Sequence, residues 1–397
     1  MKEFDSELQP ESIIGSLQSP IPTQLKTDLA NTDFPIKFAS NYLSIAKTHM
    51  SDVVVGPKNF ADIQSVAQYF PSNLTSFLGF ECRLGATDRR TDLAFAISGI
   101  GKDRQALVDV MRNGSLPEQF IQQQEWKQLE GFAKSWADAS SALHDKIKCF
   151  WLEFDMPESL PAIPIPCIFF GVAKLPKGVS NSDSTQYEWI AHTALPLLRG
   201  RQLSKSLEEN LMECLEKMPK NASLFQVGTM LSRSTNAIRI CINKLSPIQI
   251  LPYLNSIGWT DETGEFTSLL GELEDKADRF VIDFDVTENG IGAKVGIELS
   301  FTGDQFQNET RWDQLFDYLV EKGMCIPEKR DALLGYQGMN NDEIVSGGIM
   351  KPVTSATTHF DSQSPSTTVR YINHVKIVYQ QGQPMKAKAY PAVRLFE

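Results

Sequence analysis

The sequence predicts an α+β protein: a closed antiparallel barrel of ten strands, built from five αββα repeats and surrounded by an outer ring of helices. Two observations predict this fold. Pairs of short stretches in which apolar and polar residues alternate occur five times, each after a helical stretch. An open sheet of ten strands would keep two exposed edges, which closure removes. The helices then cover the apolar strand face, and the face with the charges points into a ligand-sized lumen.

Bulk properties exclude several classes of function. A net charge of -11 argues against nucleic acid and anionic membranes as partners. No run of about 18 apolar residues predicts a membrane span, and the acidic N-terminus does not look like a secretory signal. The six cysteines are scattered without a CxxC motif, which predicts reduced thiols in a cytoplasmic protein. No GxSxG, HExxH or GxGxxG motif supports a hydrolase, zinc or dinucleotide site.

The chain divides into an N-terminal extension and one domain. Residues 1–50 are weakly patterned and early on rich in Ser, Pro, Gln and Thr, so we interpret them as the extension. Residues 51–397 then form a single barrel domain. Within this domain, residues 335–368 are polar and show no regular spacing of apolar residues. A loop of this length is either functional or disordered, and we expect it to be a lid.

The strand pairs follow from alternation, which is clearest in the fourth pair, where Glu288-Asn289-Gly290 predicts the hairpin turn. The five pairs are predicted at Leu78–Leu84 with Asp92–Ser98, Ile147–Asp155 with Cys167–Val172, Ser223–Leu231 with Ala237–Asn243, Phe280–Thr287 with Lys294–Phe301, and the two halves of His374–Tyr390. Helical periodicity predicts the intervening elements. They are Asn59–Phe70, Lys102–Arg112, Pro117–Leu143, Thr185–Arg199, Ser206–Met218, Pro247–Ile257, Phe266–Leu273, Arg311–Lys322 and Pro327–Leu334.

Strict alternation places many charged side chains inside the barrel. The carboxylates that should face inward are Glu81, Glu153, Asp155, Asp283, Asp285 and Glu298. The cations on the same face are Arg83, Arg239, Lys294, Lys376, Lys386 and Lys388. Gln226, Asn243, His374, Trp151 and Tyr390 join them. Because charge is costly to bury unless it is paired or hydrated, these residues predict a functional cavity.

From residue 50 to residue 397, the order of elements resembles the ABBA prenyltransferase fold, a barrel of five αββα units. Lys388-Ala-Tyr390 on the last strand is similar to the Lys-x-Tyr pairs with which those enzymes hold diphosphate. Glu81 on the first strand is similar in position to the carboxylate that deprotonates the acceptor in the indole-type members. The resemblance implies a transferase that moves an isoprenoid from its diphosphate to a small aromatic or peptide acceptor in natural-product biosynthesis.

Prenyl transfer assigns a role to each candidate residue. A base must accept the acceptor's proton, cations must hold the diphosphate, and aromatic faces must shield the allyl cation. The catalytic candidates are Glu81, which we expect to be the base, Glu298 and His374. The substrate-binding candidates are Arg83, Trp151, Gln226, Arg239, Lys294, Lys376, Lys388 and Tyr390. The resemblance also implies Mg²⁺ as a cofactor of some members, and Asp283 with Asp285 could hold it.

Structural interpretations stand beside these roles. Glu81 could form a salt bridge to a neighbour such as Arg239, Asp283-x-Asp285 could be an ordinary polar strand face, and the lysines could line a solvated edge. The strand Asp92–Ser98 has no basic residue and Cys167–Val172 has no Lys-x-Tyr pair, although the family often places basic residues there. Two alternatives therefore stay open. One is a cyclase or tailoring enzyme of a peptide or other natural product in the same barrel, and the other is a barrel that binds a ligand or peptide without catalysis.

Overall fold

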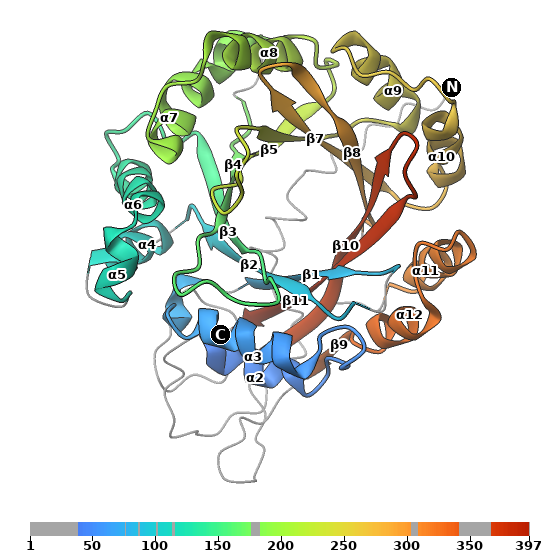
Figure 1. Ribbon diagram of the computed structural model, residues 1–397, viewed down its shortest axis with the longest axis horizontal. Helices are drawn as coiled ribbons and strands as arrows, with labels where there is room; N and C mark the ends of the chain where they lie inside the picture. Colours follow the sequence, from blue (N-terminus) through green and yellow to red (C-terminus); the bar gives the residue numbers. More distant parts are fainter. Residues whose placement is uncertain are drawn as a thin grey trace, which may run out of the picture.

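The structure is a computed structural model that describes residues 39–75, 77–85, 88–100, 102–112, 116–175, 183–302, 309–340 and 367–396. Ten strands of this part form one closed antiparallel barrel in the order β1-β2-β3-β4-β5-β6-β7-β8-β10-β11, and β11 pairs back onto β1. Figure 1 looks into this barrel, with the helices around its outside. The predicted fold class is confirmed.

Every predicted strand pair is present. The strands are β1 Phe77–Arg83, β2 Thr91–Ser98, β3 Ile147–Phe154, β4 Cys167–Val172, β5 Ser223–Thr229, β6 Ile238–Asn243, β7 Arg279–Thr287, β8 Gly290–Ser300, β9 Gly338–Asn340, β10 Thr367–Gln380 and β11 Lys386–Phe396. The short β9 pairs with β10 beyond the ring of ten strands. The turn after β7 has Gly290 at φ 100°, a backbone conformation that glycine adopts without strain.

The helices form the outer layer. They are α2 Ala39–Lys47, α3 Pro57–Ala67, η3 Ser72–Leu74, α4 Asp103–Arg112, α5 Glu118–Gln122, α6 Gln124–Ala137, η4 Ser184–Tyr187, η5 Ile190–Ala194, α7 Leu195–Arg199, α8 Lys205–Glu216, α9 Pro247–Ser256, α10 Glu265–Leu273, α11 Arg311–Glu321 and α12 Pro327–Leu334. Within the described residues, none of the helices is both long and apolar enough to cross a membrane.

The main hydrophobic core lies between the helices and the outer face of the barrel. Phe280, Ile282 and Phe284 of β7 are buried in it, as the period of two predicts, and so is Trp312 of α11. Each helix therefore covers the apolar side of its neighbouring strands. The opposite side of the same strands is left to line the lumen.

Two helical predictions need correction. The stretch Pro117–Leu143 is not one helix, because Gln123 is extended (φ -69°, ψ 143°) and separates α5 from α6, which ends at Ala137. The stretch Thr185–Arg199 is divided into the 3₁₀ turn η4, the π-helix η5 and α7. Apolar periodicity predicts which residues are buried, but it does not distinguish a continuous helix from one with a break of a single residue.

Part of the predicted N-terminal extension is structured. Residues 1–38 lie outside the described residues, but α2 packs Ala39, Leu43 and Ala46 into the main core. The long polar stretch 335–368 contributes β9. Residues 341–366 of that stretch, and with them most of the expected lid, lie outside the described residues.

Candidate functional site

The lumen contains a pocket lined by residues from most strands of the barrel. The space between its walls is about 900 Å³, including the part that opens to solvent, which lies in the range of small-molecule sites. Of the predicted candidates, those that line it are Glu81, Trp151, Gln226, Arg239, Glu298, His374, Lys376 and Tyr390. Alternation along ten strands therefore brings eight candidates together around one cavity.

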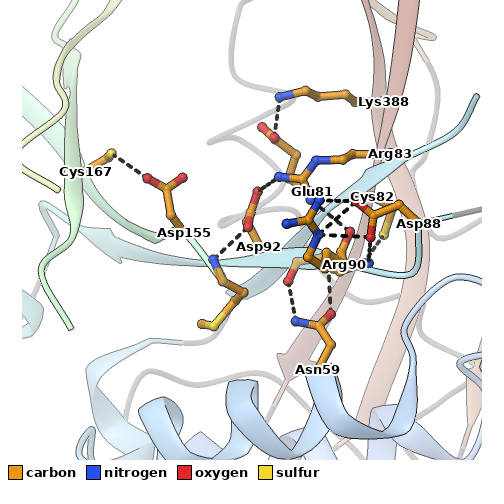
Figure 2. A network of polar contacts seen from close by, with 12 residues as sticks. Asn59, Glu81, Cys82, Arg83, Asp88, Arg90, Asp92, Asp155, Cys167 and Lys388 are labelled. Atoms are coloured by element: carbon orange, nitrogen blue, oxygen red, sulfur yellow. Dashed lines mark hydrogen bonds and ion pairs between the residues drawn. The ribbon is translucent and has the colours of Figure 1, made fainter. Parts of the chain in front are cut away.

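Glu81 is held by two residues of β11. Lys388 Nζ donates to Glu81 Oε1, and Tyr390 Oη donates to Glu81 Oε2 at 2.6 Å. Figure 2 shows Lys388 reaching toward this carboxylate across the β1–β11 seam. Burial by itself would raise the pKa of Glu81, but the charge of Lys388 and these hydrogen bonds lower it to about 2. Glu81 is therefore an ionised, fully engaged carboxylate, which makes it a weak base. A salt bridge between Glu81 and a neighbour such as Arg239 is one of the structural interpretations given above. Glu81 does form a salt bridge, but its partner is Lys388.

A second charged network crosses β6, β7 and β10. Arg239 binds both carboxylate oxygens of Asp285, at 2.9 and 3.1 Å, and lies 3.6 Å from Asp283. Lys376 Nζ lies 2.7 Å from Asp283 Oδ2. Burial would raise the pKa of Asp283, but the charges of Lys376 and Arg239 lower it. Gly296 of β8 makes room for this pair, because a Cβ there would lie 2.0 Å from Asp283 Oδ2 and 2.5 Å from Lys376 Cε.

Two other carboxyl groups in the lumen hold their protons more tightly than usual. Burial, and then the charge of Glu81, raise the pKa of Glu153 to about 7. Burial raises the pKa of Glu298 to about 8, although it faces Lys376 on the neighbouring strand. Among the described residues, the basic side chain within 4.0 Å of the Glu298 carboxyl group is His374. Burial, and then the charge of Lys376, lower the pKa of His374 to about 3, so the imidazole is neutral. Glu298 is therefore the predicted catalytic residue whose pKa lies nearest neutrality.

Aromatic rings form another part of the pocket wall. Trp151 packs edge-on against Phe77 at 5.0 Å between ring centroids, and Phe169 and Phe225 also line the pocket. His374 stacks on Tyr390 at 4.0 Å. The ring faces provide a surface that stabilises a cation without offering it a nucleophile.

Gly228 is required for this wall. A Cβ at Gly228 would lie 2.3 Å from Cε1 of Phe169. We expect Gly228→Ala to displace the Phe169 ring and to lower the free energy of unfolding by about 1–3 kcal/mol, measured by urea denaturation. The control is Gly131→Ala in α6, where nothing lies within 4 Å of the added Cβ, which should raise stability by about 0.5–1 kcal/mol. Equal stability of Gly228→Ala and the native chain would contradict the packing of Phe169.

The remaining candidates lie outside the pocket lining. Arg83 binds Asp92 at 3.0 Å and the Arg90 carbonyl, as Figure 2 shows. Lys294 and Lys386 are exposed near the end of the barrel where β8 and β11 begin. Alternation correctly assigns them to the inward face of their strands. It does not report how far along the strand a residue lies, and these two lysines lie beyond the cavity. The roles proposed for these residues stay predictions.

The sequence interpretation missed several lining residues. Phe169 lies in a strand that is apolar on both faces, so alternation does not show whether its side chain points inward or outward. A register shift in β5 between Leu224 and Gln226 brings Phe225 into the lining beside Gln226. A similar shift in β10 between Ile372 and His374 adds Asn373. Bulges of this kind re-aim side chains and leave no periodic signal in a sequence.

The predicted metal pair is engaged by cations. The carboxylates of Asp283 and Asp285 face Arg239 and Lys376, and the described residues include no cluster of three or more His, Cys, Asp or Glu side chains that could hold a metal ion. Mg²⁺ needs near-octahedral oxygen ligands. The residues present therefore do not fit this ion, and a Mg²⁺ requirement stays a prediction.

Comparisons with known proteins agree with the fold. No protein-family model matches the sequence, and no curated protein does. Among solved structures, the chain is similar to the apo form of the prenyltransferase PriB, with a TM-score of 0.51 and 11% identity over 88% of this chain and 95% of that one. It is also similar to AnaPT from Neosartorya fischeri, with a TM-score of 0.49 and 12% identity over 91% and 92%. PriB has been solved with L-tryptophan and dimethylallyl thiolodiphosphate as well. The closed ten-stranded barrel and its helical ring thus have the prenyltransferase-barrel (ABBA) fold that the element order predicts.

Proposed function

We propose that the lumen is the active site of a prenyltransferase, which moves an isoprenoid from its diphosphate to a small aromatic or peptide acceptor. The observation that supports this proposal is the lining of one cavity, which combines the aromatic rings of Trp151, Phe169 and Phe225 with Glu298, a carboxyl group of suitable pKa. The aromatic rings of such a cavity can stabilise an allyl cation, and its carboxylate can remove a proton from the acceptor that attacks this cation. Natural-product biosynthesis is the context in which we place the reaction.

The proposed step uses the residues in defined roles. The C–O bond between the allylic carbon and the diphosphate breaks, and its electron pair leaves with the diphosphate. The acceptor forms a new bond to the allylic carbon and gives its proton to the carboxylate of Glu298. With a pKa of about 8, Glu298 is a stronger base than Glu81, whose pKa is about 2. In this proposal Glu81 positions Lys388 and Tyr390 instead of accepting the proton.

A second candidate is a cyclase or other non-prenylating enzyme in the same barrel. Its support is that five cations in or near the lumen each have a carboxylate partner: Arg83 with Asp92, Arg233 with Asp155, Arg239 with Asp285, Lys376 with Asp283 and Lys388 with Glu81. A diphosphate bound by any of these cations would have to displace its carboxylate partner. Glu298, protonated below pH 8, would then act as the proton donor that starts a cyclisation.

Product analysis separates the two candidates. We expect the purified chain, supplied with dimethylallyl or geranyl diphosphate and with L-tryptophan or a tryptophan-containing peptide, to form a prenylated acceptor and one diphosphate per product. Mass spectrometry and a diphosphate assay measure both, with and without Mg²⁺. A cyclised isoprenoid without acceptor would support the second candidate. No product, together with no calorimetric binding of the matching thiolodiphosphates, would refute prenyl transfer and favour a binding barrel.

A further inference from the structure

The pocket in the lumen is lined by more carboxyl groups than cations. Among the described residues, five Asp or Glu side chains line it, compared with three Lys or Arg side chains. The carboxyl groups belong to Glu81, Asp92, Glu153, Asp155 and Glu298, and the cations belong to Arg233, Arg239 and Lys376. A cavity with an excess of one sign of charge attracts ligands of the opposite sign. The charge of a ligand therefore affects how well it binds here.

Each of the three lining cations already binds a carboxylate of the protein. Arg233 donates two hydrogen bonds to Asp155, at 2.6 and 2.9 Å. Arg239 and Lys376 belong to the charged network across β6, β7 and β10 that is described above. An acidic group of a ligand would have to break one of these ion pairs and leave a carboxylate of the protein without its partner, which is costly inside a protein. The lining therefore disfavours a ligand that carries a carboxylate.

The lining carboxyl groups are not all paired in this way. Glu81, Asp92 and Asp155 each form an ion pair with a lysine or arginine of a neighbouring strand or loop, and Figure 2 shows the pair that holds Asp92. Glu298 is the base of the proposed reaction. Glu153 is the carboxyl group that remains, and the part of the chain that the structure describes gives it neither a hydrogen bond nor an ion pair.

The position of Glu153 explains why it has no such partner. It follows Trp151 and precedes Asp155 on the inward face of β3. Across the sheet it pairs with Ala94 of β2 and with Cys167 of β4. Neither of these neighbours is charged at neutral pH, because burial raises the pKa of the Cys167 thiol to about 12. The Glu153 carboxyl group therefore lines the pocket without a cation of the protein on either adjoining strand.

Aromatic rings line the pocket next to Glu153. Trp151 pairs in register with Phe169 of β4, and both side chains line the pocket. Phe77, from β1, packs edge-on against Trp151 and lines it too. Ring faces attract organic cations, and they also pack against a flat apolar ring. An unpaired carboxyl group beside such rings is a surface that suits an aromatic molecule with a positive charge.

We propose that the acceptor is an aromatic amine that carries a positive charge and no carboxylate, and that Glu153 binds its ammonium group. The choice of an aromatic compound rests on the proposed function, whereas the preference for positive charge rests on the lining of the pocket. The ammonium donates a charge-assisted hydrogen bond to the Glu153 carboxylate. An amino acid would add a carboxylate, for which each lining cation that the structure describes is already engaged.

Calorimetric titration without an isoprenoid donor tests this preference. Three probes share an indole ring and differ in charge at neutral pH: tryptamine is a cation, L-tryptophan is a zwitterion and 3-methylindole is neutral. We expect the native chain to bind tryptamine about tenfold more tightly than either of the others, which corresponds to one charge-assisted contact. Glu153→Gln keeps the size of the side chain and should lose this advantage, while its affinity for 3-methylindole stays unchanged.

Two control variants make the test specific. Glu158→Gln removes the same charge from an exposed side chain in the loop after β3 and should bind tryptamine like the native chain. Glu298→Gln should keep the preference for tryptamine, because burial keeps most of the Glu298 carboxyl groups protonated at neutral pH. No binding of any probe, equal affinity of the native chain for tryptamine and L-tryptophan, or unchanged tryptamine affinity in Glu153→Gln would overturn the proposal.

The binding test and the product assay can fail independently. Preferential binding of tryptamine without any prenylated product would support the ammonium site at Glu153 and refute prenyl transfer. A higher yield of prenylated product from L-tryptophan than from tryptamine would support prenyl transfer and overturn the preference for positive charge. A prenylated tryptamine whose yield falls about tenfold in Glu153→Gln at low tryptamine concentration would support both.

Discussion

Replacing Lys376 by methionine is expected to lower the free energy of unfolding by about 3–5 kcal/mol, the usual cost of breaking one side of a buried ion pair. The Lys376 and Asp283 side chains are only 9% and 4% exposed, and their charged atoms lie 2.7 Å apart. Without the ammonium, the one ion-pair partner that the described residues leave to the Asp283 carboxylate is Arg239, which lies 3.6 Å away and is already bound to Asp285. Urea denaturation at pH 7 measures the loss.

Two further variants test whether the pair itself causes the effect. Lys376→Met with Asp283→Asn removes both charges and should recover most of the stability. Lys386→Met changes an exposed lysine of the adjoining β11 and should stay within about 0.5 kcal/mol of the native chain. A loss below about 1 kcal/mol in Lys376→Met would mean that the pair is hydrated and not buried as described.

Glu298→Gln is expected to reduce prenyl transfer by about 10²–10⁴-fold, the usual contribution of a positioned base. The amide keeps the shape of the side chain and cannot accept a proton. In the native chain, kcat should rise with pH until the Glu298 pKa of about 8 is passed, because the carboxylate is the active form. If Glu298 is instead the acid of a cyclase, activity should fall above that pH. The control Glu274→Gln changes an exposed carboxylate after α10 and should retain the native profile.

The same group links stability to pH. Because the pKa of Glu298 is raised in the folded state, the folded chain binds this proton more tightly, and its contribution is present at acidic pH and lost as pH rises through about 8. We expect Glu298→Gln to reduce the loss of stability between pH 6 and pH 9 by about 2–3 kcal/mol. An identical slope in the variant and the native chain would show that Glu298 titrates normally and would remove the argument for its role.

Periodicity alone determined the architecture. Alternation in stretches such as Phe280–Thr287 identified the strands and their apolar faces, and helical periodicity identified the covering layer, because burial of one face imposes a fixed period on each element. The same alternation brought Glu81, Trp151, Arg239 and Glu298 to one lumen. Bulges cannot be predicted in this way. A register shift of one residue, as at Lys148, turns a side chain to the other face of the strand without changing the residue types in the sequence.

Partners and protonation were decided by the tertiary structure. Lys388 and Glu81 are 307 residues apart, and only closure of β11 onto β1 makes them an ion pair. That pairing lowers the pKa of Glu81. Glu298 is also an inward-facing glutamate, but it has no comparable partner among the described residues, and burial raises its pKa to about 8. The sequence determined which side of each regular, alternating strand faces the lumen, because side-chain direction is a local property of a strand. The structure decided which of them is paired and which can exchange a proton, because electrostatic energy depends on distances between strands that are remote along the chain.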